Sequence, residues 1–145
     1  MPEGDPRRRL GAAGEALARR HLEARGFTLL DANFRTRHGE LDLVVADRRH
    51  LVFCEVKTRV AARRARREPR APASGPRGDE PGDDLGPFAA IGVRKRRQVR
   101  QMAREWLALR GGETAWREEV RFDAIGIEFD QRGRLIRLDH MEAAF

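Results

Sequence analysis

The sequence predicts one domain with a mixed α/β architecture, an α+β fold built on a mixed sheet. Three observations support this prediction: two stretches with helical spacing of apolar residues, five short β-rich stretches, and the order in which they alternate. The chain has 145 residues and a mass of 16.5 kDa, which is the size of a single domain. We therefore treat residues 1–145 as one folding unit.

The first half of the chain is predicted to form one helix followed by three strands. Apolar residues recur at helical spacing from Leu10 to Ala24, and Gly26 then provides a stop signal. The second and third strands are separated by Asp47-Arg48-Arg49-His50, a polar sequence typical of a hairpin. The three β-rich runs occupy residues 27–34, 40–46 and 51–57.

The second half is predicted to form one helix and a further hairpin. An amphipathic helix at 91–109 ends before Gly111-Gly112. Strands at 120–129 and 135–139 are joined by the turn sequence Asp130-Gln131-Arg132-Gly133. The predicted order is therefore αβββαββ.

Residues 58–87 differ in composition from the rest of the chain. They contain five of the seven prolines, four glycines, seven arginines and five acidic residues, with almost no large apolar side chain. Such a segment buries too little surface to offset the entropy lost on ordering. We expect a disordered, Arg/Pro-rich insertion within the domain.

The charge balance favours a polyanionic partner. Thirty basic residues against 23 acidic ones give a net charge of +7 and a pI near 11.1. All the basic residues are arginines except Lys57 and Lys95. The lone Cys54 excludes an intrachain disulfide, and no apolar run is long enough to span a membrane. We expect a cytoplasmic protein with no membrane partner.

The first hairpin is predicted to gather carboxylates. A turn at Arg48-Arg49 pairs positions whose numbers add up to 97, so Asp42 lies opposite Glu55 and Glu40 lies opposite Lys57. Directly opposite residues share a face, which places these four side chains together at the end remote from the turn. The other face is predicted to be the core, with Leu41, Leu43, Val45, Val52, Cys54 and Val56.

This cluster has the chemistry of a divalent-metal site. Carboxylates about 5 Å apart repel each other by about 3 kcal/mol at an effective dielectric constant near 20. Mg²⁺ would offset this repulsion, with Asp42 and Glu55 as ligands and Lys57 placed to orient or deprotonate an attacking water. Alternatively, Glu40 and Lys57 form an ordinary cross-strand ion pair and Asp42 lies at a solvated strand end.

The second helix carries further cations. Lys95 falls within the apolar stripe, where an ammonium group needs a carboxylate or phosphate partner or must extend to the rim of the core. The opposite face is either a solvated surface or a track for nucleic-acid phosphates. It carries Arg96, Arg97, Arg100 and Arg104.

Several blocks, in order along the chain, closely resemble the bacterial YraN family. The earlier blocks are Gly14-Glu15, Asn33-Phe34-Arg35, Gly39-Glu40-Leu41-Asp42-Leu43-Val44 and Val52-Phe53-Cys54-Glu55-Val56-Lys57-Thr58-Arg59. The later blocks are Lys95-Arg96-Arg97 and Arg121-Phe122-Asp123-Ala124-Ile125. YraN proteins are similar to PD-(D/E)XK nucleases and, among these, to archaeal Holliday-junction resolvases. The resemblance implies a restriction-endonuclease-like core.

The resemblance also implies roles for individual residues. Asp42, Glu55 and the carbonyl of Val56 would bind Mg²⁺, for which Mn²⁺ can substitute. Lys57 would serve the attacking water, and Lys95 would contact the scissile phosphate or position the water. Glu15, which could instead pair with Arg19 on its own helix, would complete the acidic cluster. Asp123 has no catalytic assignment, and we expect it to pair with a neighbouring arginine.

The leading hypothesis is a Mg²⁺-dependent endonuclease that acts on branched or single-stranded DNA. Related resolvases cut two strands, which is compatible with a homodimer. Two alternatives stay open: a catalytically silent nucleic-acid-binding module with the same fold, and an adaptor whose Arg-rich insertion docks an acidic protein or RNA.

Overall fold

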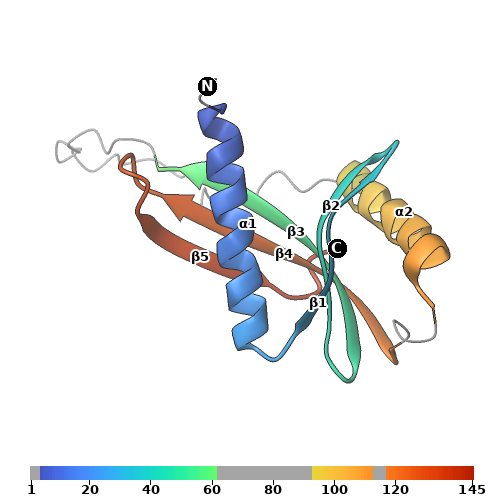
Figure 1. The fold of residues 1–145 in the computed structure, drawn as a ribbon. Coiled ribbons are helices and arrows are strands. Elements are labelled where there is room, and N and C mark those ends of the chain that lie inside the picture. Colours follow the sequence, from blue (N-terminus) through green and yellow to red (C-terminus); the bar gives the residue numbers. More distant parts are fainter. Residues whose placement is uncertain (1–3, 62–92, 113–116) are drawn as a thin grey trace, which may run out of the picture.

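The protein folds into a five-stranded mixed sheet with one helix on each face (Figure 1). The computed structural model describes residues 4–61, 93–112 and 117–145, with the backbone alone for Val93 and Arg94. Neither helix in these ranges is long and apolar enough to cross a membrane. The elements are α1 (Pro6–Ala24), β1 (Thr28–Thr36), β2 (Gly39–Ala46), β3 (His50–Val60), α2 (Val93–Arg110), β4 (Glu119–Phe129) and β5 (Leu135–Met141).

The sheet order β1-β2-β3-β4-β5 follows the chain, and only the β3–β4 pair is parallel. A parallel pair needs a crossover connection, and α2 lies in that connection. The predicted order αβββαββ and the mixed α/β class are therefore confirmed.

Local sequence signals define both ends of α1. The Asp5 carboxylate accepts a hydrogen bond from the Arg7 amide at 3.0 Å, and Pro6 follows it in the first turn. At the other end, Gly26 adopts a φ of +94°, a conformation that favours glycine. The stop signal predicted at Gly26 is thus the residue at which the chain turns from α1 into β1.

Apolar side chains are buried on both faces of the sheet. The cluster under α2 combines sheet residues such as Val44 and Phe53 with Val99, Met102 and Trp106 of the helix. The cluster under α1 combines Ala18 and Leu22 with sheet residues, among them Leu43, Val45, Val52, Cys54, Ile125 and Ile127. The prediction that only one face of the first hairpin is core was therefore incomplete, because β2 and β3 are central strands with a helix on each side.

The strand β3 is longer than predicted. It runs to Val60 and pairs with β4 as far as Phe129, so residues 58–60 belong to the sheet rather than to the predicted insertion. Pairing with a neighbouring strand outweighed the polar composition of this stretch. The rest of the predicted insertion, together with the start of the 91–109 helix, lies outside the described residues.

Strand β2 changes face at Asp42. Leu41 packs in the same cluster as Val44 and Ala46, whereas strict alternation would place it with Leu43 and Val45. Its partner strand is irregular at the same level, because Asn33 has a φ of +54° between the pairs Ala32–Leu43 and Phe34–Leu41. The prediction that Leu41 faces the Leu43 side was wrong because this irregularity reverses the alternation.

We expect the contact between Gly14 and Thr58 to be a sensitive point of the α1–β3 interface. A Cβ atom on Gly14 would lie 2.1 Å from Thr58 Oγ1, whereas one on Gly11 would meet no atom within 4 Å. Gly14→Ala should therefore lower the free energy of unfolding by about 1–3 kcal/mol, as measured by urea denaturation. Gly11→Ala is the matched control and should be neutral or stabilising by up to about 1 kcal/mol. Equal stability of the two variants would contradict this packing.

Candidate functional site

The candidate site lies where strands β2 and β3 separate. The ladder between them has the predicted register, from Ala46–Leu51 to Leu43–Cys54. Beyond Cys54, β3 continues beside β4, and β2 continues beside β1. Asp42 and Glu55 are therefore not ladder partners, and neither are Glu40 and Lys57, contrary to the prediction.

Asp42 fills the gap left by the missing ladder. Its Oδ2 atom accepts a hydrogen bond of 2.8 Å from the backbone N–H of Val56. A side-chain carboxylate here takes the place of a backbone carbonyl, and it fixes Asp42 against β3. The two predicted acidic residues are brought together by this contact instead of by regular pairing.

Glu55 carries a buried oxygen without a partner. Its Oε1 atom forms an ion pair with Lys95 Nζ at 2.9 Å, and the side chains are 14% and 35% exposed, respectively. Its Oε2 atom is buried and makes no hydrogen bond with the described residues. The inward position of Lys95 on α2 is thus explained by its ion pair with Glu55. A carboxylate was one of the two partner types that the sequence predicted for this lysine. One oxygen of Glu55 is therefore left without a hydrogen-bond partner within the described residues.

Glu15 joins the cluster through Asn33. With its nitrogen facing the carboxylates, the Asn33 amide donates to Glu40 Oε1 at 2.7 Å and to both Glu15 oxygens at 3.1–3.2 Å. The alternative pairing of Glu15 with Arg19 does not form, because Arg19 binds Glu23 at 2.9 Å. No role was predicted for Asn33. The one sequence signal for such a role was that asparagine is rare inside strands, and Asn33 lies inside a predicted strand.

Burial and neighbouring carboxylates raise the affinity of Asp42 and Glu15 for protons. The pKa of Asp42 rises from 3.8 to about 7, mainly through burial and further through repulsion from Glu55, Glu15 and Glu40, although the hydrogen bond from Val56 opposes the rise. Burial, together with repulsion from Glu40, also raises the pKa of Glu15, although its hydrogen bond with Asn33 opposes this change. The cluster is therefore a region of excess negative charge that one lysine only partly neutralises.

The two lysines differ in their surroundings. Alternation along β3 places Lys57 on the same face as Glu55. Lys57 is exposed and makes no ion pair with any residue that the structure describes. The ordinary Glu40–Lys57 ion pair does not form, and Glu40 instead lies 3.9 Å from Arg35 Nε. Lys57 is thus an exposed ammonium group on the Glu55 face of β3, with no partner among the described residues.

The number of ligands is small. Within residues 4–61, 93–112 and 117–145, no three Asp, Glu, His or Cys side chains are grouped closely enough to hold a metal ion by themselves. Asp42 and Glu55 offer two carboxylates. Mg²⁺ commonly uses one or two carboxylates and completes its shell with water and substrate phosphates.

The arginines of α2 do not act as one uniform stripe. Arg96, Arg97, Arg100 and Arg104 are all exposed. Arg100 differs from the others in its contacts, because its guanidinium lies 5.4 Å from the centre of the Phe122 ring and donates to the Phe145 carbonyl at 3.3 Å. All four predicted arginines therefore lie at the surface, and Arg100 is partly engaged by Phe122 and Phe145.

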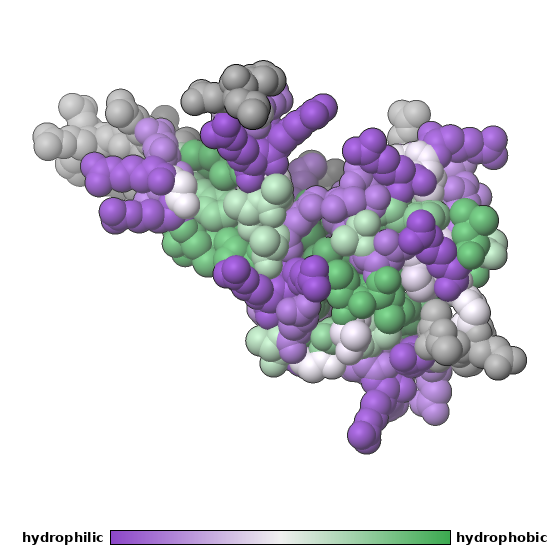
Figure 2. Space-filling model, in the orientation of Figure 1, coloured by the Kyte–Doolittle hydropathy of each residue, from purple (hydrophilic) through white to green (hydrophobic). Residues whose placement is uncertain are grey.

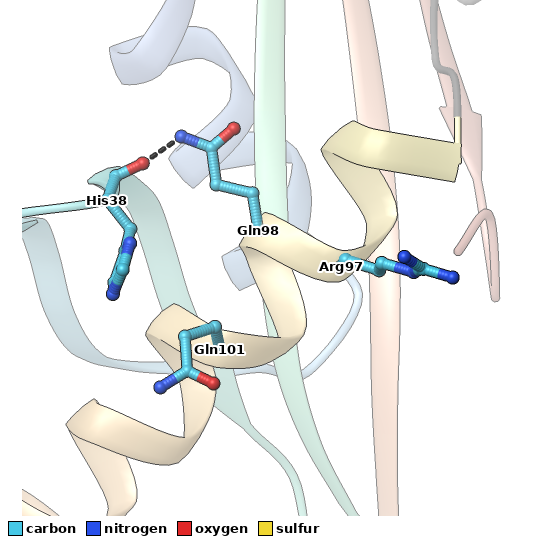
Figure 3. A pocket seen from close by; sticks show the side chains of 4 residues that line it. All are labelled: His38, Arg97, Gln98 and Gln101. Atoms are coloured by element: carbon cyan, nitrogen blue, oxygen red, sulfur yellow. Dashed lines mark hydrogen bonds between the residues drawn. The ribbon is translucent and has the colours of Figure 1, made fainter.

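A polar pocket of about 550 Å³ adjoins α2 and the turn between β1 and β2 (Figure 3). It is lined by His38, Arg97, Gln98 and Gln101. Gln98 donates to the His38 carbonyl, whereas the Arg97 side chain extends away from that contact. Gln98 lies one turn along α2 from Lys95, so this pocket opens on the α2 side of the acidic cluster.

Asp123 belongs to a separate, fully satisfied network. Asp123 is completely buried and accepts two hydrogen bonds from Arg121, at 2.8 and 2.9 Å. The predicted pairing of Asp123 with a neighbouring arginine is therefore confirmed. His140 and the Ala143 amide bind the same carboxylate at 2.8 and 3.0 Å. Burial raises the pKa of Asp123, but these hydrogen bonds outweigh burial and bring the pKa below its usual value. The network ties the C-terminal residues to β4 and is structural.

We expect Asp42→Asn to stabilise the metal-free protein, because it removes a buried charge but keeps an acceptor for Val56. The folded-state pKa of Asp42 is above its unfolded value, so the wild type loses stability as the pH rises from about 4 to 8. The gain in unfolding free energy should reach on the order of 4 kcal/mol at pH 8 and vanish near pH 4. Chemical denaturation in EDTA across this range measures it.

Asp47→Asn is the control for this experiment. Although burial raises the pKa of Asp47, hydrogen bonds from His50 and Arg49 bring it below its usual value. This variant should therefore lose stability at neutral pH, and the loss should shrink in acid. A pH-independent effect of Asp42→Asn would contradict the proposed repulsion.

Comparison with known proteins identifies the family. The family model of the uncharacterised protein family UPF0102 matches residues 14–127. A UPF0102 protein of Anaeromyxobacter dehalogenans is 38% identical over 143 residues, covering 99% of this chain and 88% of the relative. Relatives from Frankia casuarinae and Pelotomaculum thermopropionicum are 39% and 38% identical, covering 94% and 97% of this chain and 95% and 98% of their own lengths. The chain therefore belongs to the uncharacterised protein family UPF0102, the YraN family.

Proposed function

We propose that this protein is a cytoplasmic, Mg²⁺-dependent endonuclease that hydrolyses phosphodiester bonds in branched or single-stranded DNA. One observation carries the proposal: two partly buried carboxylates, Asp42 and Glu55, converge where two central strands separate, and the buried Glu55 Oε2 atom has no hydrogen-bond partner among the described residues. A buried carboxylate oxygen without a partner is costly, and a bound cation would remove that cost.

The residues fit a divalent cation. Asp42 and Glu55 supply oxygen ligands, as Mg²⁺ prefers, and the raised pKa of Asp42 reflects negative charge that a cation would neutralise. The Val56 carbonyl is a further candidate ligand. Mn²⁺ would substitute because it accepts the same oxygen ligands. When bound, the metal would supply water activation and would stabilise charge on the phosphate.

The remaining residues of the cluster have distinct roles in this proposal. Lys57 is exposed on the same face as Glu55, so its ammonium group can orient the attacking water. In its neutral amine form, Lys57 can also accept a proton from that water. Lys95 holds Glu55 in place through the 2.9 Å ion pair and can turn to a substrate phosphate. Glu15 and Asn33 hold the α1 side of the cluster in position.

The positive surface favours a nucleic-acid substrate. The net charge is +7, and arginines lie at the N-terminal end of α1 and along α2. Figure 2 shows hydrophilic side chains at the same two ends of this face, around the N-terminus of α1 and around α2. Such surfaces attract the phosphate backbone without regard to sequence.

One observation favours a second candidate function, a catalytically silent nucleic-acid-binding module. Lys95 already neutralises one oxygen of Glu55, so the site has an internal cation in place of a metal. In that case the carboxylates would hold α2 on the sheet, and the basic surface alone would act. The presence or absence of metal-dependent cleavage separates the two functions.

We expect the purified protein to cleave flapped, branched or single-stranded DNA in Mg²⁺ or Mn²⁺ and to be inactive in EDTA. Asp42→Asn and Glu55→Gln should lower the cleavage rate by at least about a hundredfold, because each removes a ligand charge. Both variants should still bind DNA, as measured by fluorescence anisotropy. Calorimetry should show Mg²⁺ binding to the wild type and not to the double variant.

Glu23→Gln is the matched control, since Glu23 lies on the exposed side of α1 and binds Arg19. It should cleave DNA at the wild-type rate. If wild-type cleavage persists in both Asp42→Asn and Glu55→Gln, the proposed site is wrong. If the wild type binds DNA but neither cleaves it nor binds Mg²⁺, the silent module is supported instead.

We expect Arg97→Ala to weaken DNA binding at all sequences and to reduce the slope of log affinity against log salt by about one, because it removes one phosphate contact. Titrations at several salt concentrations measure both quantities. Arg20→Ala removes an exposed arginine on α1 instead and serves as the control. Equal salt slopes for both variants would argue against a phosphate track on α2.

A further inference from the structure

A second pocket lies between the N-terminal half of α1 and the C-terminal end of β3, and we propose that it binds one unpaired nucleotide next to the phosphate that is cleaved. This inference rests on the proposed function and narrows its substrate to DNA with a single-stranded segment at the cleavage site. The pocket has a volume of about 380 Å³ and is lined by Arg7, Leu10, Gly11, Glu15, Val56, Thr58, Arg59 and Val60.

The pocket exists because two glycines shape this side of α1. Gly14 lets the helix approach β3 so closely that a Cβ atom would collide with Thr58 Oγ1. One turn earlier, Gly11 leaves open space, since a Cβ atom there would meet no atom within 4 Å. The helix and strand therefore touch at Gly14 and diverge toward the N-terminal end of α1 (Figure 1), leaving a hollow between them.

The pocket is continuous with the acidic cluster. Glu15 lines it from α1, and Val56, whose N–H binds Asp42, lines it from β3. A molecule in the pocket therefore lies directly beside the carboxylates. A nucleotide held there would share its backbone with a phosphate placed at Asp42 and Glu55.

The lining combines the groups that a nucleotide requires. Arg7 is exposed and forms no ion pair with the described residues, so its guanidinium is available to a phosphate. Arg59 binds Glu128 through one nitrogen at 3.1 Å and keeps its remaining donors. Leu10, Val56 and Val60 supply an apolar surface for a sugar or base. None of the described lining residues is aromatic, so recognition by base stacking is not expected.

The size of the pocket determines the type of DNA. Its volume lies at the lower end of the range for small-molecule sites, roughly 300–1,000 Å³, and a duplex is far too wide to enter it. A base paired in a duplex would also have to leave its stack, which costs a few kcal/mol, whereas an unpaired base pays little. The pocket therefore selects single strands, flaps and the unpaired bases of junctions.

Gly11→Leu tests this inference, because Gly11 lines the pocket, a Cβ atom there meets no atom within 4 Å, and leucine favours helix. Ala12→Leu, on the exposed side of α1, is the matched control. Binding of a fluorescent oligodeoxythymidine and of a blunt duplex is measured by anisotropy in EDTA. Gly11→Leu should weaken single-strand binding by about tenfold, or about 1.4 kcal/mol, and leave duplex binding unchanged.

A second pair of variants tests the charge in the pocket. Arg7→Glu should weaken single-strand binding more than Arg8→Glu, since Arg8 is exposed but does not line the pocket. Thermal denaturation checks that all four variants fold. This pair keeps the test valid if Gly11→Leu is poorly folded.

The outcomes for the pocket and for the proposed function are distinguishable. If Gly11→Leu binds single strands like Ala12→Leu, and Arg7→Glu like Arg8→Glu, the pocket inference is overturned even where the wild type cleaves DNA. If the pocket variants lose single-strand binding but the wild type cleaves no DNA in Mg²⁺, the pocket stands as a nucleotide site and the nuclease proposal fails. Equal losses for single strands and duplexes would also overturn the inference.

Discussion

The centre of this molecule depends on one constraint, the desolvation and mutual repulsion of neighbouring, partly buried carboxylates. Asp42 and Glu55 meet where β2 and β3 stop pairing, and burial raises the pKa of Asp42 to about 7. Two interactions hold them there: the Val56 amide binds Asp42, and Lys95 binds Glu55. The cost of this arrangement remains because Glu55 Oε2 has no partner among the described residues. Under the proposed function, a bound cation would remove this cost.

The buried carboxylate of Asp123, in the same sheet, is stabilised by hydrogen bonds from neighbouring residues. That carboxylate receives hydrogen bonds from Arg121, His140 and the Ala143 amide, and its pKa is lowered despite burial. At Asp42 the balance has the opposite sign, since burial and, after it, the neighbouring carboxylates raise the pKa more than the Val56 hydrogen bond lowers it. The contrast supports a functional role for the acidic cluster and a structural role for Asp123.

The surrounding fold holds the acidic cluster between two helices. α1 packs against β3 at the Gly14–Thr58 contact and presents Glu15, while α2 presents Lys95 from the other face of the sheet. Polar or charged pockets open on both sides, one beside α2 and one beside α1. Under the proposed function, the two pockets would let a nucleic acid approach from either helix, and the exposed arginines of α1 and α2 would contact its phosphates.

The sequence by itself determined the order of the elements, the hairpin register near its turn and the identity of the acidic and basic residues, because periodicity and turn signals are local. It did not determine that the β2–β3 ladder ends at Leu43–Cys54, that Leu41 changes face, or that β3 runs on to Val60. These features depend on competition between neighbouring strands. The contacts of Asn33 with Glu15 and of Lys95 with Glu55 could also be found only from the tertiary structure. Each contact joins residues that are far apart in the chain, and the packing of a helix on the sheet brings them together.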